Sequence, residues 1–336
     1  MIGVYKMSKI AVFSTAMHLK KIFDDVHFER LAKLGDLYIY DKPDYSDREY
    51  ILNFIKDSDL IITAWGAPKI DNEILSLCPN LRAIIHAGGA IKALLDSDFF
   101  TRNIPISTSN GELAKGVAES TLAIMIAACK GMFTLPNELR NGLWSENRPK
   151  VKDFYHIDIG IISAGAIGRH VIKLLHNFEV NIFVYDPTLT AEQIRELGAE
   201  KCELSELMAK CDVISIHAPN IPATDNMINA ENLPLVRDGA VIINTARPNS
   251  IDDDALIAEL SKNRFMAVID VPPKEPLPLD HPYRSLPNVV LFPHIGGAVS
   301  NGCKRMGQFA IEEAERLFRG EELRGAVDLS RLSIMA

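Results

Sequence analysis

Three polar residues in the second half of the chain have side chains suited to the reduction of a carbonyl group. Arg247 follows the apolar run VIINTA, Glu275 follows VIDVPPK and His294 follows VVLFP. The imidazole of His294 can donate a proton near neutral pH, and a carboxylate beside it would stabilise the imidazolium and raise its pKa. The guanidinium of Arg247 can hold a carboxylate through two parallel hydrogen bonds and polarise a carbonyl oxygen. Each residue alone is usually structural, so the functional interpretation depends on all three.

These three residues follow short apolar runs that predict parallel strands. Such runs, bounded by turns, are typical of buried strands, and the carboxyl ends of strands in a doubly wound sheet form a ligand crevice. The fold would therefore bring the three side chains to one edge of a sheet. The second half contains six runs of this kind, at residues 157–162, 182–185, 213–217, 241–244, 266–271 and 289–292, with helical patterns at 191–197, 204–209, 229–235 and 252–261.

The stretch 157–187 has the pattern of a strand–turn–helix–strand unit that binds a dinucleotide. Its three fingerprint positions hold Ser163, Gly165 and Gly168, so the first departs from glycine. Gly165 would allow close approach of a pyrophosphate and Gly168 would allow helix–strand contact, whereas Ser163 must make the tight turn without glycine's access to positive φ. The alternative interpretation is an ordinary βαβ crossover.

Asp186 ends the second strand of this unit, eighteen residues beyond Gly168. A carboxylate there can accept hydrogen bonds from the hydroxyls of an adenosine ribose. Because no Lys or Arg follows until Arg195, a 2′-phosphate would lack a partner. The sequence therefore favours NAD over NADP.

The first hundred residues also alternate strand-like runs with helical segments, which indicates a second βα unit. Expected strands lie at residues 10–13, 37–40, 60–62 and 83–86. The Gly88-Gly89 pair follows the last of them, and its backbone amides could bind a carboxylate or form a plain tight turn. Trp65, just past the preceding strand, could line the same cleft or pack in the core. Long helices are expected at 111–132, as a bridge between domains, and at 303–319.

The composition is that of a globular protein and excludes several classes. The chain has 336 residues, enough for roughly two domains, with 47% hydrophobic and 24% charged residues. The net charge of −8 argues against nucleic acid as a partner, and no segment is long and apolar enough to predict a membrane span. The five cysteines are scattered without metal-ligand spacing. They predict reduced thiols, no metal site and a cytoplasmic protein.

Several motifs together resemble the D-isomer-specific 2-hydroxyacid dehydrogenase family. They are HAPNIPATDNMINAENL (217–233), GAVIINTAR (239–247), VIDVPPKEPLP (268–278) and FPHIGG (292–297), with RAIIHAGG and NGELAKGVAESTLAIMIA in the first half. The resemblance implies an α/β fold of two Rossmann-like doubly wound parallel-sheet domains with a cleft between them. The substrate domain would comprise residues 1–113 plus 306–336, and the NAD-binding domain would comprise 114–305.

The same resemblance assigns roles to particular residues. His294 would be the general acid/base, Glu275 its carboxylate partner and Arg247 the substrate anchor, while Trp65 and the loop Gly88, Gly89 and Ala90 would bind the substrate. Asp270 would approach the nicotinamide carboxamide. The implied cofactor-binding set is Ser163, Gly165, Ala166, Ile167, Gly168, Asp186, His217, Ala218, Pro219, Thr245, Ala246, Asp270, His294 and Gly296. The resemblance also implies a homodimer formed through residues 114–150, which is typical of the family.

The chain departs from the family pattern in three places. Besides Ser163, the usual Arg-Gly-Gly reads Arg247-Pro248-Asn249, and the usual Phe-Glu after Asp-Val reads Pro272-Pro273. Pro248 is expected to push Arg247 toward an extended conformation.

The leading hypothesis is an NAD-dependent reductase of small 2-keto acids. The alternative is an NAD(H)-sensing regulatory or scaffold protein with little or no turnover. A formate or phosphite oxidiser is disfavoured by Glu275 beside His294, because the formate oxidisers of this family have Gln there. Phosphoglycerate is disfavoured because the loop 63–69 offers only Lys69 for a phosphate.

Overall fold

The computed structural model describes residues 7–96, 99, 101–144, 148–297 and 299–335. The chain divides into two compact units, residues 1–113 with 298–334, and residues 114–297. Residues 299–305 were expected in the nucleotide-binding domain but belong to the first unit. The reason is that helix α11 (Asn301–Arg319) is continuous and buries Cys303 in the same core cluster as Ala310 and Ala314.

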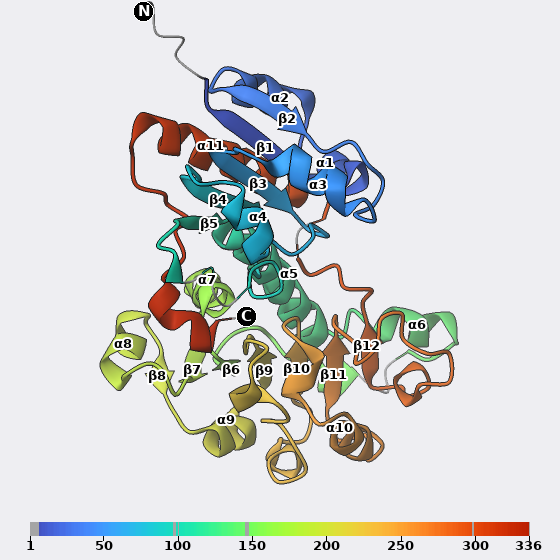
Figure 1. Cartoon of the computed structure of the whole chain (residues 1–336). Coiled ribbons are helices and arrows are strands. Elements are labelled where there is room, and N and C mark those ends of the chain that lie inside the picture. Colours follow the sequence, from blue (N-terminus) through green and yellow to red (C-terminus); the bar gives the residue numbers. More distant parts are fainter. Residues whose placement is uncertain (1–6, 97–98, 100, 145–147, 298, 336) are drawn as a thin grey trace, which may run out of the picture. The chain divides into compact units, whose positions relative to one another are not determined.

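The first unit is built on a parallel sheet of five strands in the order β2-β1-β3-β4-β5 (Figure 1). Its strands are β1 (Lys9–Phe13), β2 (Asp36–Ile39), β3 (Leu60–Ala64), β4 (Ala83–Ala87) and β5 (Ile106–Thr108). This is the flavodoxin-like doubly wound order, whose switch point lies between β1 and β3. The strand β5 was not expected, because it has only three residues and pairs beyond β4 at the edge.

Alternate residues of these strands face two separate layers of helices. Ile10, Val12 and Ile62 pack in one cluster with side chains of α1 (Ala16–Ile22), α2 (Asp25–Ala32) and α11. On the other face, Phe13 and Ile61 pack with α3 (Arg48–Ile55) and α4 (Asn72–Ser76). Burial on both faces explains why these strands are apolar along most of their length.

The second unit contains a parallel sheet of seven strands, in the order β12-β11-β10-β9-β6-β7-β8. The strands are β6 (Asp158–Ile162), β7 (Asn181–Tyr185), β8 (Glu200–Lys201), β9 (Val213–Ile216), β10 (Val241–Asn244), β11 (Met266–Ile269) and β12 (Val289–Leu291). Six were expected, and the seventh, β8, is a two-residue edge strand on β7. Read from β8 to β11, the strand order is the Rossmann order 3-2-1-4-5-6, and β12 adds a seventh strand at the edge. The direction in which successive strands are added therefore changes at β6, although all strands remain parallel.

Helices cover both faces of this sheet as well. The side of Ile161, Val184 and Ile243 packs against α5 (Asn110–Cys129) and α7 (Ala166–Leu175), with α8 (Ala191–Glu196) beside them. The opposite side packs against α9 (Leu204–Lys210) and α10 (Asp253–Leu260). A short helix α6 (Leu135–Arg140) follows α5. Helix α5 ends at Cys129 and not at 132, because Gly131 adopts φ +64° and begins a turn.

The prediction of a helix over residues 229–235 is wrong, since only a 3-10 turn, Leu233–Leu235, forms there. The Asn232 side chain accepts a hydrogen bond from Asn229 N and donates one to Met227 O. Such side-chain bonds compete with the helical ladder, and Pro234 lacks an amide donor.

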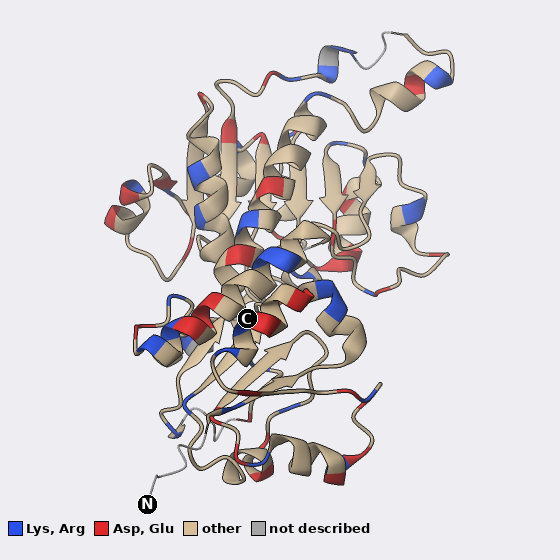
Figure 2. Ribbon diagram, turned by 90° about the horizontal axis from the view of Figure 1, so that it is seen from above, with Lys and Arg blue, Asp and Glu red and all other residues tan. Residues whose placement is uncertain are grey.

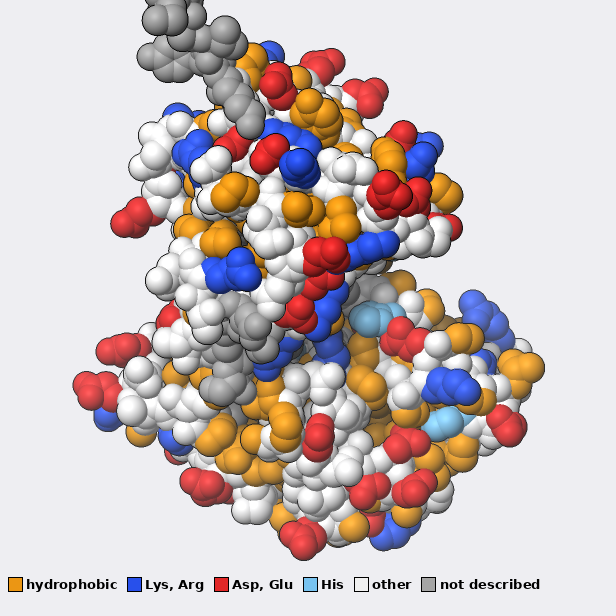
Figure 3. All heavy atoms as spheres, in the orientation of Figure 1, with side chains coloured by type: hydrophobic (Ala, Val, Ile, Leu, Met, Phe, Trp, Pro, Cys, Tyr) orange, Lys and Arg blue, Asp and Glu red, His pale blue; other side chains and the backbone are white. Residues whose placement is uncertain are grey.

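The surface carries mixed charge. Figure 3 shows acidic and basic side chains interspersed with other residues over the visible faces of the two units, and Figure 2 marks both kinds of residue along the ribbon. Among the described helices, none is long and apolar enough to cross a membrane. Within the same part of the chain, no group of three His, Cys, Asp or Glu side chains is placed to hold a metal ion. All five cysteines are buried free thiols.

Candidate functional site

The turn after β6 has the backbone path of a glycine fingerprint although its first residue is serine. Ser163 adopts φ +75°, and its N–H donates to Tyr185 O at 2.8 Å. The expectation that Ser163 would turn without positive φ is wrong, and this conformation costs a non-glycine residue about 1–2 kcal/mol. Gly168 shows why the path is needed: a Cβ there would lie 2.3 Å from Ser163 O.

Helix α7 begins directly after this turn, with Gly165 as its N-cap. A Cβ at Gly165 would meet nothing within 4 Å, so open space lies in front of the helix. Ala166 and Ile167 form its first turn, whose amide groups have no partners within the helix. Free N–H groups and the helix dipole favour an anion at this end, which fits a pyrophosphate.

Asp186, after β7, is buried and oriented by three hydrogen bonds. Its Oδ2 accepts from Ala164 N at 2.9 Å, and its Oδ1 accepts from the N and Oγ1 of Thr188 at 2.8 and 2.7 Å. A carboxylate has about four acceptor positions, so one remains for a ribose hydroxyl. Thr188 was missed from the sequence, although a hydroxyl two residues after an Asp is a familiar signal of an Asx turn.

Arg169 is a second residue that sequence reasoning missed. It follows Gly168 in the first turn of α7 and folds back, so that its Nε donates to Ala164 O at 3.0 Å. This places a guanidinium beside the fingerprint turn. A cation directly after the last fingerprint position was the signal available in the sequence.

The segment after β9 buries its histidine side chain. His217 Nε2 lies 3.0 Å from Ser215 Oγ, and burial lowers the pKa of His217 to about 3. Its Nδ1 has no partner among the described atoms. Ala218 is buried too, and Pro219 is half-buried, with its carbonyl accepting from Thr224 Oγ1 at 2.6 Å. The Pro219 side chain is therefore more accessible than the His217 side chain to a cofactor at this edge of the sheet.

The segment after β10 holds Arg247 in an extended conformation, at φ −145° and ψ 145°. This confirms the effect expected of Pro248. Arg247 O accepts from Asn244 Nδ2 and from Ser250 Oγ, each at 2.9 Å, and Arg247 NH1 donates to Ala246 O at 2.7 Å. The main chain of Arg247 is thus fixed from two sides.

Thr245 and Ala246 lie buried before Arg247. Thr245 Oγ1 is 3.1 Å from Thr121 Oγ1 of helix α5, and Ala246 N donates to Asn244 Oδ1 at 3.0 Å. Both residues therefore help to hold the end of strand β10 in place.

Asp270, after β11, clamps the loop that carries His294. Its Oδ1 accepts from Ile295 N at 2.8 Å and its Oδ2 from Gly296 N at 2.9 Å, while His294 N donates to Asp270 O at 3.0 Å. A Cβ at Gly296 would lie 2.7 Å from the Asp270 carboxylate, so this close approach requires glycine.

His294 and Glu275 come together as expected. His294 Nδ1 lies 2.8 Å from Glu275 Oε1, and the two side chains are 50% and 48% exposed. This contact leaves Nε2 of His294 as the nitrogen available to another molecule. The carboxylate fixes the orientation of the ring through Nδ1, which is how a general acid is held in one tautomer.

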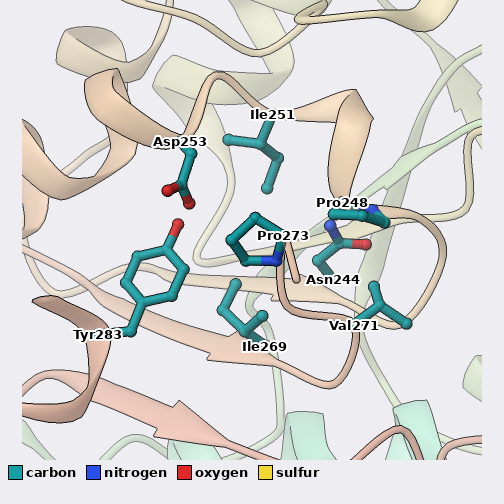
Figure 4. Close-up of a pocket in the computed structure, with 8 residues that line it drawn as sticks. All are labelled: Asn244, Pro248, Ile251, Asp253, Ile269, Val271, Pro273 and Tyr283. Carbon is teal, nitrogen blue, oxygen red and sulfur yellow. The ribbon is translucent and has the colours of Figure 1, made fainter. Parts of the chain in front are cut away.

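Pro248 and Pro273, two of the departures from the family pattern, line one small cavity. It encloses about 10 Å³, room for roughly one water molecule. Figure 4 shows Pro273 at the centre of the group, near Pro248 and Asn244, with the Tyr283 hydroxyl directed at Asp253. Burial and the Asp253 carboxylate raise the pKa of Tyr283. The loops that carry Arg247 and Glu275 thus share one packed support.

A larger pocket of about 260 Å³ lies on the side of helix α5. Apolar side chains dominate its lining, and Asp270 and Gly296 form its polar edge. Its lining residues are Ser120, Ala123, Ile124, Ala127, Phe133, Asp270, Phe292, Ile295 and Gly296.

In the first unit, the predicted substrate-binding residues follow β3 and β4. Gly88 N donates to His86 O at 2.8 Å, so its amide is occupied. Within the described part of the chain, the amides of Gly89 and Ala90 have no hydrogen-bond acceptor, so they are the available donors. Trp65 is partly buried against the α1 and α11 side of the sheet, and its carbonyl accepts from Ser14 Oγ at 3.1 Å.

Known proteins with similar sequences are enzymes of one class. The chain is 30% identical to a hydroxypyruvate reductase of Thermotoga maritima over 82% of this chain and 89% of the relative. It is 28% identical to a D-3-phosphoglycerate dehydrogenase of Methanocaldococcus jannaschii over 93% of this chain, but it spans only 59% of that relative. The solved structure of a phosphoglycerate oxidoreductase from Rhizobium etli matches 95% of this chain and 98% of its own, at a TM-score of 0.80 and 27% identity.

The family comparison covers more than half of the chain. Residues 122–296 match the family described as D-isomer specific 2-hydroxyacid dehydrogenase, NAD binding domain. This span contains the fingerprint turn, Asp186, Arg247, Glu275 and His294. The two parallel sheets of five and seven strands agree with the two-domain fold of the related structure. The chain therefore belongs to the D-isomer specific 2-hydroxyacid dehydrogenase family.

Proposed function

We propose that the protein is an NAD-dependent reductase of small 2-keto acids that also oxidises the corresponding D-2-hydroxy acids. The observation that carries this proposal is the 2.8 Å contact between His294 Nδ1 and Glu275 Oε1 at the carboxyl edge of the sheet. A nicotinamide, when bound, would supply the hydride to the carbonyl carbon. His294 Nε2 gives its proton to the carbonyl oxygen, and the Glu275 carboxylate stabilises the imidazolium before that transfer.

Arg247 is assigned to the substrate. Its guanidinium would pair with the carboxylate or the carbonyl oxygen and stabilise the negative charge that develops there. The amides of Gly89 and Ala90 would hold the substrate carboxylate. A phosphorylated substrate is disfavoured, because Lys69, the one cation of the loop 63–69, is paired with Asp96.

NAD is the proposed cofactor. Asp186 offers its remaining acceptor position to a ribose hydroxyl and would repel a 2′-phosphate. The open space at Gly165 and the free amides of α7 suit the pyrophosphate, and Arg169 would add a positive charge beside it. The edge formed by Asp270 and Gly296 is assigned to the nicotinamide.

We assign the protein to the cytoplasm as a homodimer formed through residues 114–150. Buried free thiols are consistent with a reducing compartment. The segment after α5 exposes large apolar side chains, which are usually covered in an oligomer. These are Met132, Leu139, Leu143 and Trp144, at 59%, 55%, 42% and 74% exposure. Light scattering after gel filtration is expected to give twice the mass of the 37.2 kDa chain.

The test of the activity is the loss of NADH absorbance with purified protein and a panel of keto acids. Glyoxylate, hydroxypyruvate, pyruvate, phenylpyruvate and branched 2-keto acids are assayed with NADH, and in parallel with NADPH. Turnover of at least one acid, faster with NADH, is expected. NADH binding without turnover of any acid would contradict the reductase and support an NAD(H)-sensing protein.

A further inference from the structure

Glu275 stands in a loop that its own backbone does little to hold. The loop, residues 272–278, follows β11 and contains four prolines, which have no N–H to donate. Within the described residues, none of the other amides of this loop donates to a backbone carbonyl. The Glu275 side chain is 48% exposed. Neighbouring elements must therefore set the position that brings its carboxylate within 2.8 Å of His294 Nδ1.

Tyr283 supports the first half of this loop. It lies in the 3-10 turn Pro282–Arg284, is 3% exposed, and shares the small cavity of Figure 4 with Pro273. Its hydroxyl is directed at the carboxylate of Asp253, the first residue of α10. A buried hydroxyl is costly without a partner, so this contact holds the ring against the helix. Because the cavity encloses only about 10 Å³, the ring also limits how far Pro273 can move.

His281 contacts the same carboxylate. Its Nδ1 accepts from Tyr283 N at 3.3 Å, so its Nε2 carries the proton and donates to Asp253 Oδ2 at 3.2 Å. The rings of His281 and Tyr283 lie 4.7 Å apart between centroids. Asp253 thus anchors both aromatic side chains to α10.

Arg284 supports the second half of the loop. Its Nε donates to Pro278 O and its NH2 donates to Leu277 O, each at 2.8 Å. Hydrogen bonds from a charged donor are stronger than neutral ones, and two on successive carbonyls fix the direction of the backbone. The Leu277 side chain is buried in the core cluster that also contains Tyr283. Glu275 therefore lies between two points that are held by adjacent residues of one turn.

We propose that Tyr283 and Arg284 are positioning residues, which clamp the Glu275 loop from its two ends and keep the Glu275 carboxylate on His294. The proposal rests on the proposed function, since it takes His294 as the general acid and Glu275 as its partner. Proton transfer needs a donor held within hydrogen-bond reach of the acceptor. A displaced loop should therefore slow the chemical step more than it weakens the binding of substrate or cofactor.

The first test is Tyr283→Phe, which keeps the ring in the core and removes only the hydroxyl. In steady-state reduction of a keto acid with NADH, it is expected to lower kcat about 3- to 10-fold and to leave KM within about twofold. The high-pH limb of the kcat profile should move to lower pH, because a less well placed carboxylate stabilises the imidazolium less. An unchanged kcat and pH profile would overturn the role of Tyr283.

Arg284 is tested with two variants. Arg284→Met removes both hydrogen bonds to the loop and should lower kcat in the same way. Arg284→Lys keeps a charged donor that can reach one carbonyl, so it should recover part of the loss. Equal activity of the natural protein and Arg284→Met would overturn the role of Arg284.

The matched control is Tyr40→Phe in the first unit. Tyr40 is 1% exposed and its hydroxyl donates to Asp44 O at 2.7 Å, so this change also removes a buried hydroxyl. It is expected to lower Tm as much as Tyr283→Phe does, with kcat and its pH profile unchanged. A loss of kcat in Tyr40→Phe equal to that in Tyr283→Phe would overturn the proposal, because general destabilisation would then explain both.

A double-mutant cycle asks whether Tyr283 acts through Glu275. Glu275→Gln has already lost the carboxylate charge, so the addition of Tyr283→Phe should lower kcat by less than about twofold further. A further loss as large as that in the natural protein would show that Tyr283 acts independently of Glu275, against the proposal.

A failure of the proposed function is distinguishable from a failure of the clamp. If NADH binds but no keto acid turns over, NMR of protein with nitrogen-labelled histidine still reports which nitrogen of the neutral His294 ring carries the proton. The contact with Glu275 keeps that proton on Nδ1. Tyr283→Phe is expected to shift it toward Nε2, and Tyr40→Phe is expected to leave it in place. An unchanged His294 ring in Tyr283→Phe would overturn the clamp.

Discussion

Each sheet has a histidine near the carboxyl end of a strand, but the two histidines have opposite environments. His86 is the next-to-last residue of β4 in the first sheet, is 4% exposed and lies 2.9 Å from Thr63 Oγ1 through its Nδ1. Burial lowers the pKa of His86 to about 4. His294 follows β12 of the second sheet, is half-exposed and is bonded to Glu275. A strand end thus does not decide the role of a histidine; its burial and its partner do.

The comparison separates two kinds of work at the sheet edges. In the first unit, a buried His86 supports a glycine turn, and under the proposed function the backbone amides of that turn would bind the substrate. In the second unit, the same proposal assigns the charges and the proton to Arg247, Glu275 and His294. The proposed function thus divides binding through backbone amides from chemistry through side chains.

The largest effect is expected from removing the imidazole of the second unit. His294→Asn is expected to lower kcat about 10²- to 10⁴-fold, the usual contribution of a general acid. Its NADH dissociation constant should change less than about threefold. Asn is the preferred substitution because His294 adopts φ +53°, which Asn tolerates better than most residues.

The second unit offers a matched control. His156 also adopts a positive φ, +54°, and faces Glu179 at 3.7 Å on the surface. His156→Asn is expected to leave kcat unchanged. Turnover of His294→Asn at the level of the natural protein, measured by NADH absorbance, would remove His294 from the mechanism.

The next effect concerns acid stability and the buried histidines. The folded-state pKa of His86, about 4, lies below the ordinary 6.5. The unfolded chain therefore binds the proton more readily, and the free energy of unfolding falls as the pH drops from about 6.5 toward 4. From pH 7 to pH 5 the loss attributable to His86 is about 2 kcal/mol.

Urea unfolding of His86→Gln checks this expectation. The variant should lose about 2 kcal/mol less than the natural protein between pH 7 and pH 5. His217→Gln should behave likewise, because burial lowers the pKa of His217 to about 3. An unchanged pH dependence in both variants would mean that other groups control acid unfolding.

Two glycines, one in each unit, sharpen the comparison further. A Cβ at Gly88 would lie 2.3 Å from His86 Nε2, whereas a Cβ at Gly165 would meet nothing within 4 Å. Gly88→Ala is therefore expected to destabilise the fold by about 1–3 kcal/mol. Gly165→Ala is expected to leave the fold intact but to weaken NADH binding about tenfold, because the cofactor needs that space.

Thermal unfolding and NADH titration of both variants separate the two effects. The reverse pattern, with a destabilised Gly165→Ala and a stable Gly88→Ala, would contradict this account of the two turns.

The sequence alone allowed most strands and the grouping of His294 with Glu275 to be predicted. Short apolar runs between turns define buried strands locally, and strand ends in a parallel sheet meet at one edge. The strand β5 escaped prediction because its three residues are held by distant partners, with Thr108 N donating to Gly325 O. The roles of Arg169 and Thr188 also depend on contacts across the fingerprint turn, which appear only when the chain is folded.

The smallest effect is expected at Ser163, whose positive φ was not predicted from the sequence. Ser163 occupies a glycine conformation at φ +75°, at a cost of about 1–2 kcal/mol. Ser163→Gly removes that cost but adds about 0.5–1 kcal/mol of chain entropy to the unfolded state. The net gain is up to about 1.5 kcal/mol, and each kcal/mol raises Tm by about 2–4 °C for a unit of this size.

NADH affinity should change less than about threefold in Ser163→Gly, because the backbone already follows the path that glycine would take. Ser163→Ala retains a Cβ and is expected to stay within about 0.5 kcal/mol of the natural protein. If Ser163→Gly is more stable than the natural protein and Ser163→Ala is equally stable, the free-energy cost at this position comes from the backbone conformation. A destabilised Ser163→Ala would instead mean that the Ser163 hydroxyl stabilises the turn. Serine would then be tolerated in this glycine conformation because of a hydrogen bond that its side chain makes.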